Sequence, residues 1–99
     1  MIRNVVTGRL REPAEPGDDA VVDAALAGIR ALDRPGQLAD DAGRDEGLRA
    51  GGWSYAIVND WSDADADHRY DLDEEHDRHR AALVGVSAEV ARVQLDLPR

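Results

Sequence analysis

The stretch "GWSYAIVNDW", residues 52–61, decides the fold of this 99-residue chain. Its large side chains fall on every second residue, and smaller side chains fall between them. Because successive side chains of a β-strand point to opposite faces, this alternation predicts a strand. One face of that strand carries Trp53, Tyr55, Ile57, Asn59 and Trp61.

Three further strands are predicted around this one. Residues 2–10, "IRNVVTGRL", are rich in β-branched side chains and end at "REPAEPG", whose prolines and glycine close the strand. Residues 37–45, "QLADDAGRD", have a weaker pattern. Residues 89–97, "EVARVQLDL", form the last strand, in which three apolar side chains face one way: Val93, Leu95 and Leu97.

Helical spacing of apolar residues follows Asp18 and continues to the "DRPG" turn, which predicts an amphipathic helix with Asp18 as its N-cap. After the central strand, Ser62 is expected to cap a short helix over 63–71, because an acidic residue stands three positions further on. A second helix is expected over about 74–86.

The predicted order is β-α-β-β-α-β, which defines an α+β fold of the ferredoxin-like type. Ninety-nine residues are the length of one domain, so we expect residues 1–99 to form a single unit. The aromatic content is low, with two tryptophans, two tyrosines and no phenylalanine. Such a thin core favours a homo-oligomer, which hides additional apolar surface.

Charge and composition exclude several functions. The chain has 21 acidic and 12 basic residues, a net charge of −9, which argues against nucleic acid or an anionic membrane as a partner. The absence of cysteine excludes disulfides and thiolate chemistry. The longest apolar stretch, "VVDAALAGI", is too short to span a bilayer, and no signal-peptide pattern opens the chain. We therefore expect a cytoplasmic protein.

The acidic segment "SDADADHRYDLDEEH", residues 62–76, has the carboxylate spacing of an EF-hand loop. However, His68 stands where that loop needs glycine, and a strand precedes the segment, so a solvated acidic face is the simpler interpretation. Asp73, His76 and His79 form a second candidate metal set. Histidines spaced in this way are common on helix surfaces, and we expect no metal site.

Three segments of the chain, in the same order, resemble the stress-responsive A/B barrel (Dabb) family: "MIRNVV", "GWSYAIVNDWSD" and "HRYDLDEEHDRHRAAL". The resemblance implies ferredoxin-like protomers that pair their sheets into a dimeric α/β barrel. It also implies kinship with polyketide cyclases of the olivetolic acid cyclase type, which use no cofactor. In those enzymes a tyrosine and a histidine six residues apart perform the acid–base chemistry, and Tyr70 and His76 match that spacing.

The chain also departs from the family pattern. A histidine is common in the family's first strand, and this chain has Asn4 there. The usual His-Pro-x-His motif is replaced by "DEEH", in which Asp73 stands for the first histidine and His76 remains. The first helix offers "DAALAG" where the cyclase carries aromatic side chains. The substrate is therefore expected to differ from that of the cyclase.

These residues suit the enolisation of a β-keto compound. A histidine, with an ordinary pKa of about 6.5, can act as the base, and a tyrosine hydroxyl can donate a hydrogen bond to the developing oxyanion. We predict His76 and Tyr70 as this catalytic pair. Strand parity adds four candidates for substrate binding on faces that could meet the helices: Asn4, Val6, Tyr55 and Ile57.

An alternative without catalysis stays open at this point. Tyr70 could be a core aromatic residue with its hydroxyl at the rim, and His76 could be an exposed imidazole surrounded by acidic residues. The protein would then be a dimeric module that binds a small hydrophobic ligand or serves in stress response.

Overall fold

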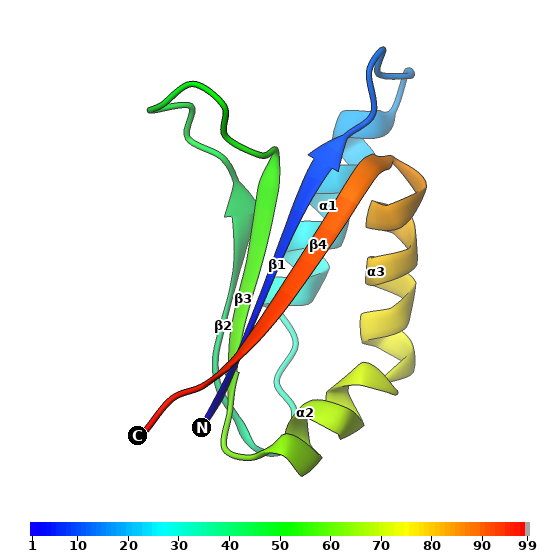
Figure 1. Cartoon of the computed structure of the whole chain (residues 1–99). Coiled ribbons are helices and arrows are strands. Elements are labelled where there is room, and N and C mark those ends of the chain that lie inside the picture. Colours follow the sequence, from blue (N-terminus) through cyan, green and yellow to red (C-terminus); the bar gives the residue numbers. More distant parts are fainter. Residues whose placement is uncertain (99) are drawn as a thin grey trace.

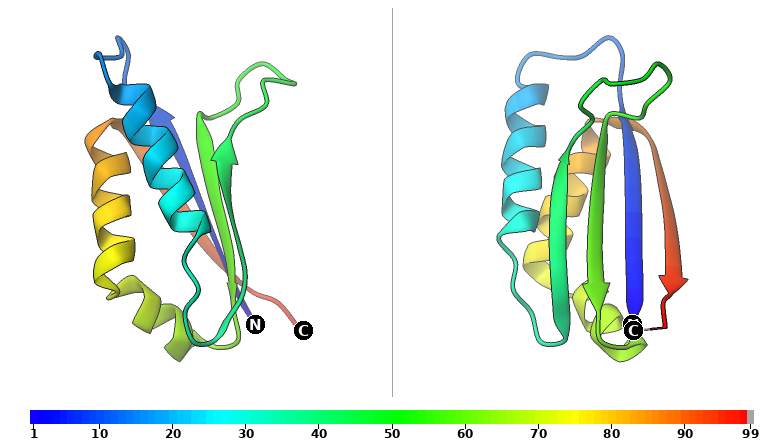
Figure 2. Two further views of the ribbon diagram at one scale, coloured as in Figure 1. Left: turned by 180° about the vertical axis from the view of Figure 1, so that it is seen from behind. Right: turned by 90° about the vertical axis from the view of Figure 1, so that its left-hand side faces the viewer.

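A computed structural model describes residues 1–98. Its four strands form one antiparallel sheet in the order β2-β3-β1-β4 (Figure 2). The strands are β1 (Ile2–Leu10), β2 (Gln37–Arg44), β3 (Tyr55–Trp61) and β4 (Ser87–Asp96). The two long strands β1 and β4 pair along almost their whole length, so the two termini lie at the same end of the sheet (Figure 1).

Three helices cover one face of this sheet and leave the other face open (Figures 1 and 2). They are α1 (Asp18–Arg30), α2 (Ala64–Asp71) and α3 (Glu74–Gly85). The predicted ferredoxin-like α+β fold is confirmed, with the second helical region divided into α2 and α3. None of the helices in the described part of the chain is long and apolar enough to cross a membrane.

Strand register brings the predicted faces together beneath the helices. Asn4 pairs with Asn59, Val6 with Ile57, and Gly8 with Tyr55. Three of these side chains join the core formed with α1 and α3, which consists of Val6, Val22, Ala25, Leu26, Ile29, Tyr55, Ile57, Leu83 and Val86. A second, smaller core of Leu32, Trp61, Ala66 and Tyr70 closes the other end of the sheet.

Two predicted helix caps were wrong by one residue. Gly17, with φ of 91°, is the N-cap of α1, and the Asp18 carboxylate instead accepts hydrogen bonds from Arg11 and from the Glu15 N–H. Asp63, not Ser62, caps α2 by accepting from the Ala66 N–H at 2.9 Å. Ser62 still belongs to the extended chain, because its N–H donates to the Gly36 carbonyl.

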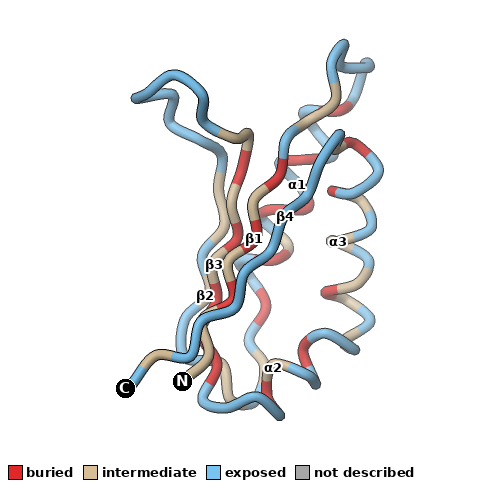
Figure 3. Tube along the Cα trace, viewed as in Figure 1, coloured by how far each residue is buried: buried red, intermediate tan, exposed pale blue. Residues whose placement is uncertain are grey.

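Two strand boundaries also differ from the prediction. Strand β3 begins at Tyr55, so Trp53 lies outside it, with the guanidinium of Arg9 4.4 Å from its ring centre. Strand β4 begins at Ser87, two residues earlier than expected, because the chain leaves α3 directly into the pairing with β1. Along β4 the chain is exposed almost throughout (Figure 3).

The open face of the sheet carries a small apolar area. Val5 pairs with Val58 on one side and with Val93 on the other, so these three side chains share that face with Leu95. Val93 is 52% exposed and Leu95 is 43% exposed, which leaves uncovered apolar surface in the isolated chain.

The close approach of Gly8 to the Tyr55 ring gives a test of the register. A Cβ on Gly8 would lie 1.9 Å from Cζ of Tyr55, so Gly8→Ala must displace a buried ring and its hydrogen bond to Ser87. Overpacking of this kind costs about 1–3 kcal/mol, measurable by urea unfolding. Gly43→Ala is the matched control in the same sheet, because nothing lies within 4 Å of its added Cβ. Equal stability of the two variants would contradict the register.

Candidate functional site

A cavity of about 220 Å³ lies between the sheet and the pair α2–α3. The six side chains predicted as site residues all line it: Asn4, Val6, Tyr55, Ile57, Tyr70 and His76. Its apolar wall continues into α1 and α3 through Ile29 and Leu83, and residues of the edge strand β4 also line it. The structure thus brings the six residues together; the roles assigned to them stay predictions.

Tyr70 and His76 stack against each other in this cavity. Tyr70 is 3% exposed and His76 is 8% exposed, so neither ring lies on the outer surface. Their ring centres are 3.9 Å apart with an angle of 29° between the planes, and Trp61 packs on Tyr70 at 4.5 Å. The tight turn between α2 and α3, closed by the bond from Asp73 N to the Tyr70 carbonyl, sets this arrangement.

A buried amide, Asn59, connects the sheet to the Tyr70 hydroxyl. Its Oδ1 accepts from the Trp61 indole N–H at 2.8 Å and from Asn4 Nδ2 at 3.3 Å, and its Nδ2 lies 3.4 Å from the hydroxyl oxygen. Asn59 is fully buried. Sequence reasoning placed it on the correct strand face but did not predict it as a site residue; its position two residues from Ile57 on that face was the available signal.

The predicted carbonyl-binding role of Asn4 is limited by its neighbours. Asn4 donates to Asn59, and its Oδ1 lies 3.4 Å from Gln94 Nε2. Gln94 also donates to Asp67 at 3.0 Å, which joins β4 to α2 across the cavity. Asn4 therefore has one amide hydrogen left for a ligand.

Burial sets the protonation states of the stacked pair. It lowers the pKa of His76 below the ordinary 6.5, and the nearby positive charge of Arg80 lowers it further. The imidazole is thus neutral at pH 7 and able to accept a proton. Burial, followed by the negative charge of Asp40, raises the pKa of Tyr70 above its ordinary value, so the hydroxyl keeps its proton and acts as a donor.

His76 Nδ1 is buried and has no hydrogen-bond partner among residues 1–98. The carboxylate of Asp77 lies 3.7 Å from this nitrogen, which is beyond hydrogen-bond range. The Tyr70 backbone carbonyl also interacts with this imidazole and favours its charged form, but burial has the larger effect on the pKa.

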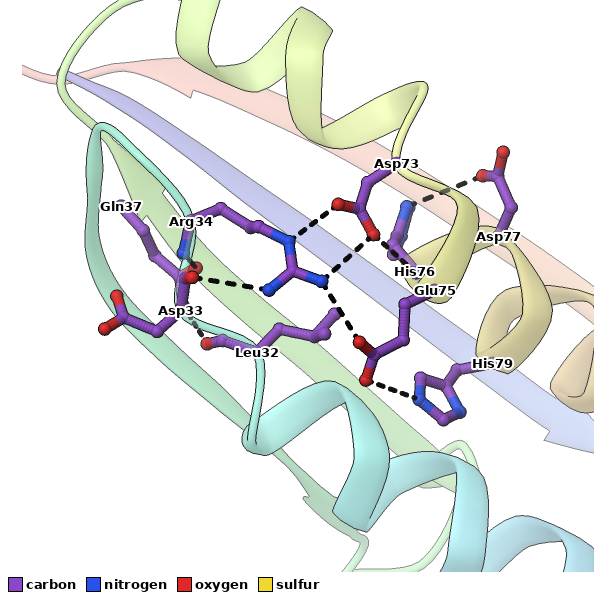
Figure 4. Close-up of polar contacts among 9 residues, drawn as sticks. All are labelled: Leu32, Asp33, Arg34, Gln37, Asp73, Glu75, His76, Asp77 and His79. Atoms are coloured by element: carbon purple, nitrogen blue, oxygen red, sulfur yellow. Dashed lines mark hydrogen bonds and ion pairs between the residues drawn. The ribbon is translucent and has the colours of Figure 1, made fainter.

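An ion-pair cluster fixes the start of the helix that carries His76 (Figure 4). Asp73 caps α3 by accepting from the His76 backbone N–H at 3.0 Å, and Arg34 Nε donates to the same carboxylate at 2.6 Å. Arg34 also reaches Glu75 at 3.1 Å. The turn before β2 is thereby tied to the turn between α2 and α3. Sequence reasoning did not find Arg34, because the partners stand 39 positions apart.

The candidate metal set does not converge. Asp73 binds Arg34, His76 faces the cavity, and the His79 ring lies against Gly28 of α1, where an added Cβ would be 2.2 Å from it. Within the described residues, no group of three histidine or acidic side chains could hold a metal ion. The start of the EF-hand-like spacing is likewise used as a helix cap by Asp63.

Sequence reasoning also missed Asp40 of β2. This carboxyl is half-buried on the helix side of the sheet, across from Asn59. Burial raises its pKa from 3.8 to about 6. Nothing in the sequence marks it, since its strand has no clear alternation and "DD" reads as a solvated pair.

The cap on α3 can be tested by stability. Asp73→Ala removes both the N-cap acceptor and the partner of Arg34, and loss of an N-cap alone costs about 0.5–2 kcal/mol. Asp73→Asn keeps a capping oxygen but loses the charge, so it separates the cap from the ion pair. We expect Ala to be clearly less stable than Asn in urea unfolding. If the two variants unfold at the same urea concentration, the capping role is wrong.

Comparisons with known proteins agree with the fold. No family model and no curated protein matches the sequence. A dimeric ferredoxin-like protein of unknown function from Thermobifida fusca is 27% identical, with a TM-score of 0.83 and 97% of this chain and 90% of that chain covered. SnoaB, a cofactor-independent oxygenase from Streptomyces nogalater, is 19% identical over 99% and 93% of the two chains, with a TM-score of 0.68.

An antibiotic biosynthesis monooxygenase is 16% identical, with a TM-score of 0.73 and both chains covered completely, at 100%. These likenesses show that the chain has the ferredoxin-like fold. The resemblance to the Dabb family noted in the sequence gains no family-model match, so it stays an expectation.

Proposed function

We propose that this protein is a small cofactor-free acid–base enzyme that enolises a hydrophobic poly-β-keto or related compound and closes it by an aldol-type step. The observation that carries this proposal is the stacking of Tyr70 on His76 in the cavity between the sheet and the helices. A neutral imidazole and a protonated phenol side by side are the base and the donor that enolisation needs.

In the first step, His76 removes a proton from the carbon between two carbonyl groups, and the C–H electron pair moves onto a carbonyl oxygen. The Tyr70 hydroxyl donates a hydrogen bond to that oxygen. Its own oxygen is already supported by the Asn59 amide, which leaves the hydroxyl proton for the substrate.

In the second step, the enolate carbon attacks another carbonyl carbon of the same molecule, and a C–C bond forms. The new alkoxide takes the proton from the His76 imidazolium, which returns the histidine to its neutral form. One C–H bond and one C=O bond are thus converted into a C–C bond and an O–H group, with no oxidant or cofactor.

The remaining predicted residues fit an apolar substrate. Val6 and Ile57 line the cavity from the sheet with apolar side chains. The Tyr55 hydroxyl is 2.9 Å from Ser87 Oγ, so Tyr55 contributes its ring rather than a donor. Two of the solved structures with this fold, at 19% and 16% identity, are of a cofactor-independent oxygenase and an antibiotic biosynthesis monooxygenase, which supports a small enzyme of this kind.

Catalysis is tested by His76→Gln and Tyr70→Phe, with ring closure of a synthetic poly-β-keto N-acetylcysteamine thioester followed by ultraviolet absorbance. Loss of a positioned acid–base group lowers the rate about 10²–10⁴-fold. Because protonation disables the base, kcat/KM of the wild type should fall on an acid limb whose midpoint lies below pH 6.5, in keeping with the lowered pKa of His76. His79→Gln, which changes the same residue type outside the cavity, is the control.

Wild-type turnover that survives both substitutions would refute the catalytic pair. The protein would then fit the non-catalytic alternative, a ligand-binding module in which Tyr70 and His76 only pack. Binding of the same thioester to all variants with unchanged affinity and no turnover would identify that outcome.

We also propose that the chain is a cytoplasmic homodimer that pairs two copies through the open face of the sheet, as the sequence resemblance implies. The Thermobifida fusca protein with this fold is described as dimeric. Sedimentation at micromolar concentration should give twice the mass of the chain, and Val93→Asp should shift it to the monomer. Leu72→Asp is the control, because Leu72 is 78% exposed in the turn between α2 and α3. A monomeric wild type would contradict the proposal.

A further inference from the structure

A one-residue β-bulge places Gln37 and Asp40 on the same face of the sheet, beneath the helices. Gln37 pairs with Trp61, yet Ala39 pairs with Asp60 and Asp40 with Asn59, so Leu38 is an extra residue in β2. In a regular strand, Gln37 and Asp40 would face opposite sides of the sheet, whereas here both lie on the helix side. Asp40 itself follows the regular alternation of the strand, with Ala42 and Arg44 on the same face, and the bulge brings the Gln37 amide to its side.

The Asp40 carboxyl lacks a well-formed hydrogen bond. Both Asp40 oxygens are buried and neither has a partner at ordinary hydrogen-bond geometry among residues 1–98, although the side-chain amides of Gln37 and Asn59 are near enough to lower the pKa of the carboxyl. The amides beside it are engaged elsewhere, since Gln37 Nε2 donates to the Leu32 carbonyl and Asn59 Nδ2 to the Tyr70 hydroxyl. A buried polar group without partners costs stability, and bulges of this kind are frequent beside functional sites.

We propose that Asp40 is a third functional residue of this site. It is a positioning residue: it holds the side-chain amide of Asn59, and that amide in turn positions the Tyr70 hydroxyl. This inference rests on the proposed acid–base function and extends it. Asn59 touches both partners: its amide lies next to Asp40, and it contacts the Tyr70 hydroxyl at 3.4 Å. Among the charged groups acting on Tyr70, Asp40 has the largest effect.

The protonation state of Asp40 determines what it does. As a carboxylic acid it is uncharged, and its carbonyl oxygen can accept from the second N–H of Asn59 Nδ2, which holds that amide against the Tyr70 hydroxyl. As a carboxylate it places a negative charge behind the position where the substrate oxyanion forms, and this opposes enolisation. The groups that face it are Gln37 from β2, Asn59 from β3 and Tyr70 from α2, and the charge of Asp41 acts on it from the opposite face of β2; none of these is a cation.

The linkage of charge to stability has a defined sign. The pKa of Asp40 is raised in the folded chain to about 6 from an unfolded value of 3.8. The fold therefore loses stability as the pH rises from the unfolded to the folded pKa, because the unfolded chain ionises first. Asp40→Asn, which cannot ionise, should have the same Tm as wild type near pH 4 and a higher Tm above pH 6.5. Asp65→Asn, at an exposed position of α2, is the control.

Communication with Tyr70 has a direct spectroscopic test. The chain contains two tyrosines, so the ¹³Cζ resonance of Tyr70 can be assigned with Tyr55→Phe. In a His76→Gln background, which removes the stacked imidazole, we expect this resonance to move with a midpoint at about pH 6. The movement should vanish in His76→Gln/Asp40→Asn. A resonance that does not titrate in the first variant, or that still titrates in the second, overturns the proposal.

The pH profile of turnover then separates this inference from the proposed function. In wild type, kcat/KM should decline on the alkaline side as Asp40 ionises; in Asp40→Asn that decline should disappear, while the acid limb of His76 remains. Asp40→Ala should lose activity at acid pH. If the Tyr70 resonance titrates with Asp40 but the protein has no turnover, only the enzymatic function is refuted. If His76→Gln abolishes turnover but Asp40→Asn keeps the alkaline decline of kcat/KM, only the role of Asp40 is refuted.

Discussion

The site depends on one buried carboxamide. Asn59 occupies the centre of the sheet, and its three polar contacts are directed to Trp61, Asn4 and Tyr70. An unsatisfied amide in this position would cost several kcal/mol, so the strand register, the Trp61 rotamer and the depth of Tyr70 must agree with one another. Stacking of His76 on Tyr70 then follows from the short turn between α2 and α3. The site is therefore a consequence of the sheet centre rather than an addition to its surface.

Arg34 provides the second constraint, from outside the cavity. By binding both Asp73 and Glu75, it joins the turn before β2 to the first turn of α3. The Asp73 carboxylate both caps α3 and accepts from the Arg34 guanidinium, so one side chain serves as helix cap and ion-pair partner. This arrangement holds His76 as the imidazole that stacks on Tyr70, while His68 also lines the cavity.

Much of the fold could be predicted from the sequence because alternation is a local property. The two-residue alternation of the strand predicted that Tyr55, Ile57 and Asn59 share one face, and that face lines the cavity. The one-residue shift from Ser62 to Asp63 as the cap of α2 arose because two adjacent residues can both cap, and only the contact of Ser62 with Gly36 decides between them. The bulge at Leu38 was not predictable, since an extra residue in a strand without clear alternation leaves no period to interrupt. Asp40 was missed because its strand lacks clear alternation and two adjacent aspartates are typical of a solvated pair.

The central claim is that His76 is a neutral, enclosed imidazole beside Tyr70. The most direct test is a ¹⁵N titration of the three imidazoles of the chain by NMR, with His76 assigned through His76→Gln. The structure predicts that His76 takes up its proton below pH 6.5, because burial and Arg80 oppose the charged form. A His76 that titrates at or above 6.5, as an imidazole exposed among carboxylates would, contradicts the enclosed site and with it the proposed acid–base chemistry.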